Sequence, residues 1–194
     1  MTTATGRVIV ISGPSGSGKT TLVEQLFAHP PGPLAKSVSA TTRQPRQGEQ
    51  EGVHYHFLSA EDFQRQRQSG EFLECFEVFG RGDWYGTPRR EVAPRLAAGK
   101  WVVLEIDVHG MQAVLGEYPN AETFFVHPGS MAELERRLRD RRTENEAAIQ
   151  RRLEAARREL ASAGLYRHQI VNDDVERAVR EIRAILTRPG EVSQ

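Results

Sequence analysis

Cysteine is almost absent from this sequence, because Cys75 is the only one among 194 residues. A single thiol forms no intrachain disulfide and cannot supply a cysteine-rich metal site. Long apolar runs are also missing: the apolar stretch near the start, residues 8–11, is far shorter than a signal-peptide core or a membrane span. The single cysteine fits a reducing compartment, and the lack of an apolar run fits the absence of a signal segment or membrane span, so we expect a cytoplasmic protein without a membrane partner.

The chain has no excess of either charge sign. Its 26 basic and 26 acidic residues cancel to a formal charge of zero. A general electrostatic attraction to nucleic acid therefore has no support in the composition, and any anion site must be local. Only three of the basic residues are lysines, so arginine is too common for a single one to indicate function.

Length and composition predict one globular domain over residues 1–194. The mass of 21.8 kDa suits one sizeable core, and 38% hydrophobic with 27% charged residues is ordinary for a globular chain. Residues 8–11 are β-branched and read as a strand buried on both faces, and residues 101–107 read as a second one. Helical patterns alternate with such strands, which predicts an α/β fold with a parallel sheet flanked by helices.

Two segments depart from this alternation. Residues 38–88 read as a small mixed α+β insert, with short antiparallel strands around a turn in 37–58 and a helix opened by a capping box at Ser59 and Asp62. Residues 136–146 are highly charged and have no apolar periodicity, so we expect a mobile connection there. Thr143 with Glu146 is expected to cap the helix that follows.

The strongest motif lies directly after the first strand. It satisfies G-x-x-x-x-G-K-[ST] and precedes an amphipathic helix, as a phosphate-binding loop requires. Its glycines let backbone N–H groups converge on phosphate oxygens, the lysine can reach the β and γ phosphates, and the threonine hydroxyl can contact Mg²⁺. The residues are Gly13, Pro14, Ser15, Gly16, Ser17, Gly18, Lys19 and Thr20.

The acceptor of the phosphoryl group is indicated by a resemblance. Residues 37–49, Ser-Val-Ser-Ala-Thr-Thr-Arg-Gln-Pro-Arg-Gln-Gly-Glu, followed by Gly52 and Tyr55, closely resemble the GMP-binding stretch of guanylate kinases. Further matches follow in order over nearly the whole chain, at residues 72–74, 85–87, 104–107, 137–138, 141, 152–153 and 171–174. The resemblance implies a P-loop NTPase core at about 7–37, 89–135 and 164–190, a GMP-binding insert at about 38–88 and a helical lid at about 136–163.

The resemblance also implies the residues that bind GMP. Arginine and tyrosine side chains are expected to hold its phosphate, and carboxylates and hydroxyls its base, because guanine presents N1–H and N2–H₂ donors where adenine presents an N1 acceptor. The expected phosphate contacts are Arg43, Arg46, Tyr55 and Tyr85. The expected base contacts are Ser39, Glu74, Thr87 and Asp107.

On the ATP side, the resemblance implies lid arginines Arg137 and Arg141, a further phosphate contact at Arg152, and Asn172 near the adenine. The expected catalytic residues are Lys19, Arg43, Arg137, Arg141 and Arg152, with Mg²⁺ as the cofactor. Their role is electrostatic, and no side chain acts as a nucleophile. Arg136, Arg139 and Arg142 are interpreted as solvated charges of the helix surface.

One turn and three single positions depart from the family pattern. The turn at residues 80–86 is about two residues longer than usual, and Asp140 and Arg142 stand where the lid usually has glycine, which removes backbone freedom. His109 stands in place of a usual glutamine and receives no role.

The predicted function is ATP-dependent phosphorylation of GMP to GDP in purine nucleotide metabolism, with ATP and GMP as the expected small-molecule partners and with monomer and homodimer both left open. Two alternatives stay open on sequence alone. One is a guanylate-kinase-like protein-interaction module on the same fold, and the other is a P-loop kinase for a different acceptor, such as ribose 1,5-bisphosphate.

Overall fold

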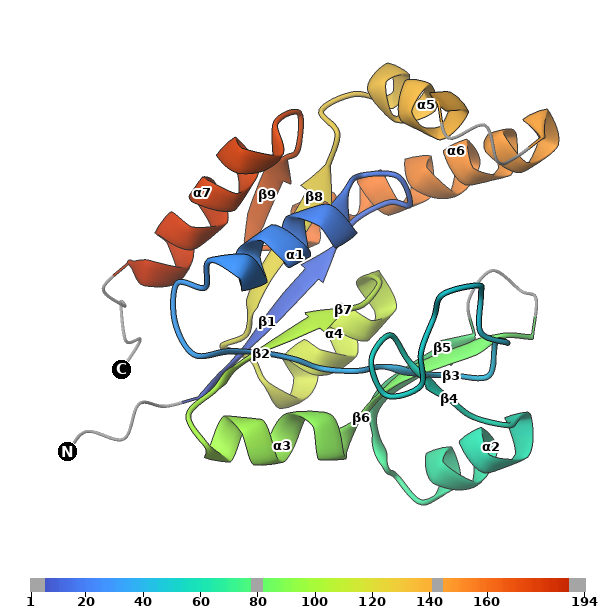
Figure 1. Ribbon diagram of the computed structural model, residues 1–194, viewed down its shortest axis with the longest axis vertical. Helices are drawn as coiled ribbons and strands as arrows, with labels where there is room; N and C mark the ends of the chain where they lie inside the picture. Colours follow the sequence, from blue (N-terminus) through green and yellow to red (C-terminus); the bar gives the residue numbers. More distant parts are fainter. Residues whose placement is uncertain (1–5, 78–81, 141–144, 189–194) are drawn as a thin grey trace. The chain divides into compact units, whose positions relative to one another are not determined.

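The computed structural model describes residues 6–77, 82–140 and 145–188. Helices and strands are interspersed along the chain, in places with two or three of one kind in succession (Figure 1). In chain order the elements are β1 (Arg7–Ser12), α1 (Lys19–Ala28), β2 (Leu34–Lys36), β3 (Ala40–Thr41), β4 (His56–Phe57), α2 (Ala60–Gln68), β5 (Phe72–Glu77), β6 (Trp84–Pro88), α3 (Arg89–Ala97), β7 (Trp101–Glu105), α4 (Val108–Glu117), β8 (Glu122–His127), α5 (Met131–Asp140), α6 (Glu146–Ala161), a 3₁₀ turn η1 (Ala163–Leu165), β9 (His168–Val171) and α7 (Val175–Thr187).

The strands form two sheets. The larger has the order β2-β7-β1-β8-β9, with β8 and β9 paired in parallel, and the smaller has the order β4-β3-β6-β5. Ile9, Val10 and Ile11 of β1 are fully buried, as expected for a strand covered on both faces. The predicted α/β fold with a parallel sheet and flanking helices is confirmed. Among the described helices, none combines the length and the apolar character that crossing a bilayer demands.

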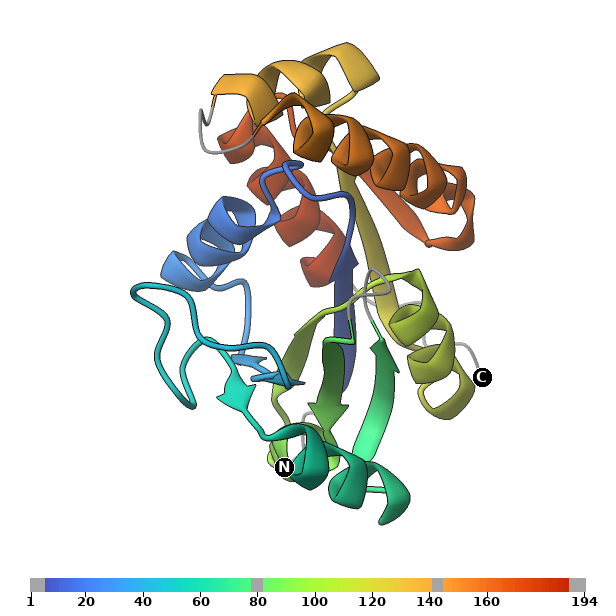
Figure 2. The ribbon, with the colours of Figure 1, turned by 90° about the vertical axis from the view of Figure 1, so that its right-hand side faces the viewer.

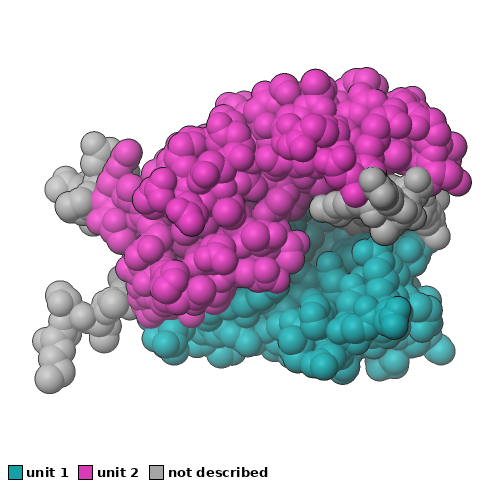
Figure 3. Space-filling model, turned by 45° about the horizontal axis from the view of Figure 1, so that its top comes forward, with its two compact units in different colours: residues 1–10, 35–122 teal, residues 11–34, 123–194 magenta. Residues whose placement is uncertain are grey.

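The chain divides into two compact units, which Figure 3 colours separately. Unit 1 comprises residues 1–10 and 35–122, and unit 2 comprises residues 11–34 and 123–194. The residues expected to bind GMP all belong to unit 1. The residues expected to bind ATP all belong to unit 2.

In unit 1 the small sheet differs from the sequence prediction. Strands β3 and β4 pair in parallel, with Ala40 opposite His56, so the antiparallel pairing expected within residues 37–58 is wrong. A parallel return requires a long connection, and residues 42–55 provide it. Glu51 fixes the end of this connection to β4, because its carboxylate accepts the Phe57 N–H at 2.7 Å.

Helix α2 begins as predicted and covers this sheet with aromatic side chains. The Ser59 hydroxyl accepts the Asp62 N–H at 3.0 Å and caps the helix. Phe63 is fully buried and stacks on Phe72 of β5, with ring centroids 4.5 Å apart. Burying such a ring contributes about 2 kcal/mol relative to leaving it exposed, so this contact anchors α2 to the sheet.

Unit 1 also contains a buried acidic side chain that the sequence did not single out. Glu91 of α3 is 8% exposed and accepts the Val38 N–H at 3.2 Å. Its carboxylate pairs with Arg95 at 2.9 Å and lies 3.1 Å from the imidazole of His56. These contacts tie α3 to β4 and to the residues just before β3.

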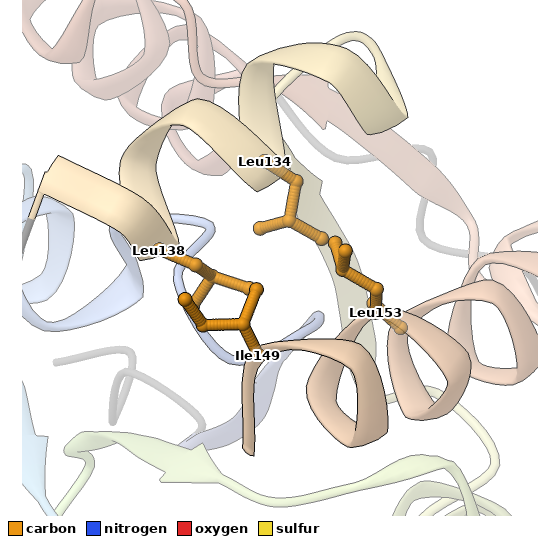
Figure 4. Packing of buried hydrophobic residues seen from close by; sticks show 5 residues of the cluster. Leu134, Leu138, Ile149 and Leu153 are labelled. Atoms are coloured by element: carbon orange, nitrogen blue, oxygen red, sulfur yellow. The ribbon is translucent and has the colours of Figure 1, made fainter. Parts of the chain in front are cut away.

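In unit 2, helices α5 and α6 lie side by side (Figures 1 and 2). Their contact is the buried cluster of Leu134, Leu138, Ile149 and Leu153 in Figure 4. The mobile connection expected at residues 136–146 is therefore wrong for residues 136–140, which are helical. Leu134 and Leu138 recur at i and i+4, so they share one helix face that α6 buries despite the many charges around them.

The start of α6 also differs from the prediction. Asn145 is the N-cap, because its side-chain oxygen accepts the Ala148 N–H at 2.9 Å. The expected cap, Thr143, lies outside the described residues. The last helix, α7, follows the prediction: Ile182 and Leu186 are buried, and the helix packs against α1.

Candidate active site

The phosphate-binding motif in unit 2 forms the connection between β1 and α1. Ser12 ends the strand, and Gly18 is the N-cap residue of the helix with a φ of 85°. Glycine adopts this left-handed conformation at little cost. A Cβ atom at this position would also lie 2.5 Å from the Asn172 amide nitrogen. The loop thus depends on glycine for both its backbone conformation and its packing.

Lys19 lies over its own loop. Its ammonium group donates to the carbonyl oxygen of Gly13 and to that of Pro14, the latter at 2.9 Å. These carbonyls keep the charge within the loop whose backbone N–H groups can bind phosphate. The lysine ammonium group therefore lies where it can contact an anion bound in this loop.

Asn172, directly after β9, supports the loop. It is 5% exposed, and its amide donates to the Ser17 carbonyl at 2.8 Å. The backbone carbonyl of Asn172 accepts an N–H of Arg137 at 2.9 Å. The Glu133 carboxylate accepts the Nε–H of the same guanidinium at 2.7 Å. The structure thus joins a predicted lid arginine to the phosphate loop. The predicted contact of Asn172 with adenine stays a prediction.

Two further predicted ATP residues lie at the loop. Arg152 of α6 donates to the Ser15 hydroxyl at 3.1 Å. Thr20 occupies the first turn of α1 and is exposed. Arg141, the second predicted lid arginine, lies outside the described residues.

In unit 1, the residues predicted for the GMP phosphate are brought together by β3 and β6. Arg43 follows β3, and its Nε donates to the Tyr85 hydroxyl at 2.9 Å. The rings of Tyr55 and Tyr85 meet edge to face with centroids 5.9 Å apart, and burial raises the pKa of Tyr55. Arg46 lies on the exposed turn that follows Arg43. Phenolic and guanidinium donors therefore gather here, as an anion site requires.

Glu74 of β5 is, like Glu91, a buried carboxylate of this unit. It is 9% exposed, and its Oε1 accepts the Thr87 hydroxyl at 2.5 Å from the neighbouring strand β6. Helix α4 approaches it closely, since a Cβ at Gly110 would lie 3.0 Å from Oε2. Burial, helped by the negative charge of Asp107, raises the pKa of Glu74 to about 7, although the Thr87 hydroxyl acts in the opposite direction.

The two other residues predicted for the base have structural contacts of their own. Asp107 is the N-cap of α4, where its Oδ1 accepts the Gly110 N–H at 2.9 Å. Ser39 accepts the His56 N–H on its carbonyl at 2.9 Å. The capping role of Asp107 follows from its position before a helix. Its predicted contact with guanine stays a prediction.

Two acidic residues that hold candidate arginines received no role from the sequence. Glu49 forms a bidentate pair with Arg43, at 2.9 and 3.0 Å, and Glu133 holds Arg137. A signal existed for Glu133, because it stands four residues before Arg137 on one helix. Glu49 reaches Arg43 across a turn, and no periodicity announces such a contact.

The comparisons with known proteins agree with this geometry. A family model described as "Guanylate kinase" matches residues 5–188. The guanylate kinase of Rhodopirellula baltica is 53% identical over 182 residues, covering 93% of this chain and 87% of that protein, and that of Thermosynechococcus vestitus is 46% identical over 98% of this chain and its own full length. A crystal structure of guanylate kinase from Anaplasma phagocytophilum matches with a TM-score of 0.75 at 33% identity, over 94% of this chain and 85% of that one. The chain belongs to the guanylate kinase family.

Proposed function

We propose that this protein transfers the γ-phosphoryl group of ATP to GMP, forming ADP and GDP in purine nucleotide metabolism, and that it does so in the cytoplasm. Family membership supports this activity. The observation that supports the acceptor best is the buried Glu74–Thr87 pair, which shares a four-stranded sheet with the Arg43–Tyr85 pair. A base-reading carboxylate and an anion site on one sheet suit a purine monophosphate. We assign GMP binding to the insert at about 38–88. We assign the lid to residues at about 136–163.

Base selection is assigned to Glu74. Above its pKa of about 7 the Glu74 carboxylate is ionised and accepts hydrogen bonds only, so it then complements the N1–H and N2–H₂ donors of guanine and opposes the N1 acceptor of adenine. The Thr87 hydroxyl keeps this carboxylate in place. Leaving a buried charged acceptor unpaired is costly, which makes the selection strong.

The GMP phosphate is assigned to Arg43, Arg46, Tyr55 and Tyr85. Guanidinium groups bind phosphate oxygens through paired, charge-assisted hydrogen bonds. The tyrosine hydroxyls add donors without adding charge. Together they hold the acceptor oxygen in one orientation, which lowers the entropic part of the barrier.

The triphosphate is assigned to the loop of unit 2. Its backbone N–H groups and the N-terminus of α1 bind the phosphates, and Lys19 moves from the carbonyls of Gly13 and Pro14 to the phosphate oxygens. Arg137 and Arg152 already contact this loop or its support and add positive charge, as proposed also for Arg141. Asn172 is proposed to contact the adenine as well as the loop.

The donor set of this loop suits Mg²⁺. The described residues contain no cluster of three His, Cys, Asp or Glu that could hold a metal by itself. Mg²⁺ keeps much of its water and binds few protein oxygens together with substrate phosphates, so the Thr20 hydroxyl is the protein ligand expected here. When bound with ATP, the ion supplies charge neutralisation at the phosphate oxygens.

In the reaction, an oxygen of the GMP phosphate forms a bond to the γ-phosphorus as the bond to the β,γ-bridging oxygen breaks. The electron pair of that bond leaves with ADP. Charge develops on oxygens throughout, and Lys19 with the arginines stabilises it without a covalent protein intermediate.

ADP formation from MgATP tests the proposal, with GMP, AMP, CMP, UMP and ribose 1,5-bisphosphate offered separately beside a control without acceptor. We expect turnover with GMP alone. Binding of GMP without turnover would favour an interaction module. Turnover only with another acceptor would retain the ATP site and remove the assigned role of the insert.

A further inference from the structure

One histidine of unit 1 lies between two carboxylates. Nδ1 of His56 is 3.1 Å from Oε1 of Glu51, and its Nε2 is 3.1 Å from Oε1 of Glu91. The side chains of His56 and Glu91 are 18% and 11% exposed, whereas that of Glu51 is 62% exposed. Arg95 pairs with Oε2 of Glu91 at 2.9 Å. We call these four side chains the His56 cluster, and none of them has a task in the proposed binding of ATP or GMP.

Both carboxylates of the cluster are ionised. Burial opposes the charge of Glu91, yet hydrogen bonds from His56 and from a backbone N–H, together with the charge of Arg95, lower its pKa. The main cause of the lowered pKa of Glu51 is the N–H that β4 donates to it, and His56 and Arg90 add to this effect. An ionised carboxylate only accepts hydrogen bonds. Both ring nitrogens of His56 therefore face acceptors.

This arrangement determines how many protons the imidazole ring carries. A neutral imidazole has one N–H and one lone pair, whereas an imidazolium has two N–H donors. Only the imidazolium can donate to Glu51 and Glu91 at the same time. With a single proton, one ring nitrogen would direct its lone pair at a carboxylate oxygen. The geometry is therefore that of a doubly protonated His56.

Loss of one proton should break the contact with Glu51 and keep the contact with Glu91. Glu91 is buried, so leaving its Oε1 without a donor would be costly. Glu51 is exposed and can turn toward water. Its other oxygen holds the Phe57 N–H at 2.7 Å, so its departure would loosen the connection of residues 42–55 where it meets β4.

The His56 cluster borders two segments that carry candidate acceptor residues. Tyr55 directly precedes His56 and forms an isolated strand bridge with Glu51. The backbone N–H just before Ser39 donates to Oε2 of Glu91 at 3.2 Å. A change in the cluster would therefore reach one residue proposed for the GMP phosphate and one proposed for the base.

We propose that the His56 cluster is a proton-binding site that adjusts the affinity for GMP. The second proton on His56 ties Glu51, and with it the connection of residues 42–55, to α3. Loss of this proton frees Glu51 and weakens GMP binding. His56 and Glu91 are thus positioning residues, and bound GMP in turn favours the protonated ring. This inference rests on the proposed function.

Calorimetric titration of GMP at a series of pH values tests the proposal, with the protonation of His56 followed by NMR in the same full-length chain. GMP affinity of the wild type should fall about fivefold or more over the pH interval in which His56 loses its proton. Each variant is compared with the wild type at the same pH, because ionisation of the GMP phosphate and of Glu74 is then common to both. ATP affinity should show no such difference.

His56→Gln should fix the chain in its weaker state. The glutamine amide can donate to Glu91 in place of Nε2, but it takes up no proton and offers no donor to Glu51. Its GMP affinity should be about fivefold below the wild type at low pH and equal to it at high pH. His54→Gln is the matched control, because His54 lies in the same connection and its Nδ1 accepts the Gln50 N–H at 3.0 Å. This variant should keep the pH dependence of the wild type.

Glu91→Gln should have the opposite effect and fix the chain in its tighter state. The new amide donates to Nε2 of His56, while its oxygen still accepts from Arg95. A neutral ring then satisfies both sides, because Nδ1–H donates to Glu51. GMP affinity should equal that of the wild type at low pH and exceed it about fivefold at high pH.

The two variants separate this proposal from a merely structural role. If His56→Gln and Glu91→Gln both bind GMP more weakly at every pH, the cluster only supports the fold, and the proposal fails. A His56 ring that keeps one protonation state between about pH 5 and pH 9 would also refute it. A wild-type chain that binds ATP but not GMP at any pH would instead overturn the proposed function. Urea unfolding of each variant checks that the compared chains are folded.

Discussion

The two units organise their candidate substrate-binding residues in different ways. In unit 1 the candidate residues are held by other side chains: Thr87 holds Glu74, while Tyr85 and Glu49 hold Arg43. In unit 2 the candidate residues are held by the backbone. Lys19 donates to two backbone carbonyls, and the Asn172 amide donates to a third. A triphosphate needs N–H groups and charge, which a loop supplies. Choosing one base requires specific side chains in fixed positions.

Lys19→Met has the largest expected effect and tests the independence of unit 2. The loop loses its charge at the phosphates, so turnover should fall by at least about 1000-fold. GMP affinity should not change, because no candidate GMP residue lies in unit 2. ADP formation and GMP calorimetry measure the two effects, with the exposed Lys100→Met as control. Near-normal turnover would contradict the assignment of the triphosphate to this loop.

Glu74→Gln tests base selection in unit 1. Replacing one carboxylate oxygen by an amide opposes a donor of guanine with another donor, so KM for GMP should rise about 100-fold. KM for ATP should stay the same. Initial rates at varied GMP and varied ATP give both values, and Glu71→Gln, at an exposed position three residues away, serves as control. Unchanged GMP kinetics would exclude Glu74 from the base site.

The same variant should be more stable than the wild type at alkaline pH. Folding raises the pKa of Glu74 from 4.5 to about 7, so the folded state favours the protonated carboxyl. The stability that this proton gives is complete below about pH 4.5 and is lost as pH rises through about 7. Urea unfolding should show similar stability at about pH 4 and an advantage for Glu74→Gln of up to about 3 kcal/mol at about pH 8. No pH dependence of the difference would contradict a raised pKa.

Two glycines with similar backbones compare the units directly. Gly18→Ala adds strain and places a methyl group 2.5 Å from the Asn172 amide, whereas Gly48→Ala adds strain in open space. We expect Gly18→Ala to raise KM for ATP about tenfold or more. Gly48→Ala should cost about 1 kcal/mol of unfolding free energy and change KM for ATP little. Equal effects on ATP would show that packing against Asn172 is unimportant.

Arg136→Ala has the smallest expected effect. Its side chain is exposed and pairs with Glu133 and Asp140 on the surface of α5, whereas the adjacent Arg137 reaches Asn172. Surface ion pairs contribute little because water screens them. Turnover and the urea midpoint should both stay at their wild-type values. A large loss of turnover would show that Arg136, and with it the exposed face of α5, belongs to the ATP site.

Much of the local structure was predictable from the sequence. The buried strand at residues 8–11, the phosphate-binding loop and the Ser59 cap depend on neighbours in the chain, so their residues carry a local pattern. Parallel pairing of β3 with β4 was not predictable, because it depends on where residues 42–55 return. The helical residues 136–140 were missed because the surrounding charges obscured Leu134 and Leu138, which become buried only when α5 packs in the tertiary structure.

The same division applies to the candidate site. The order of the elements, the phosphate loop and, through the family motif, the identity of the arginines, the tyrosines and Glu74 all follow from the order of residues in the chain. The burial of Glu74 against Thr87 and Gly110, and the contact of Glu49 with Arg43, arise from the tertiary structure alone. These contacts join residues whose relation has no period along the chain, and burial removes the water that would otherwise screen them. The shifted pKa values of these side chains, and their fixed orientations, therefore arise only when the strands and turns assemble.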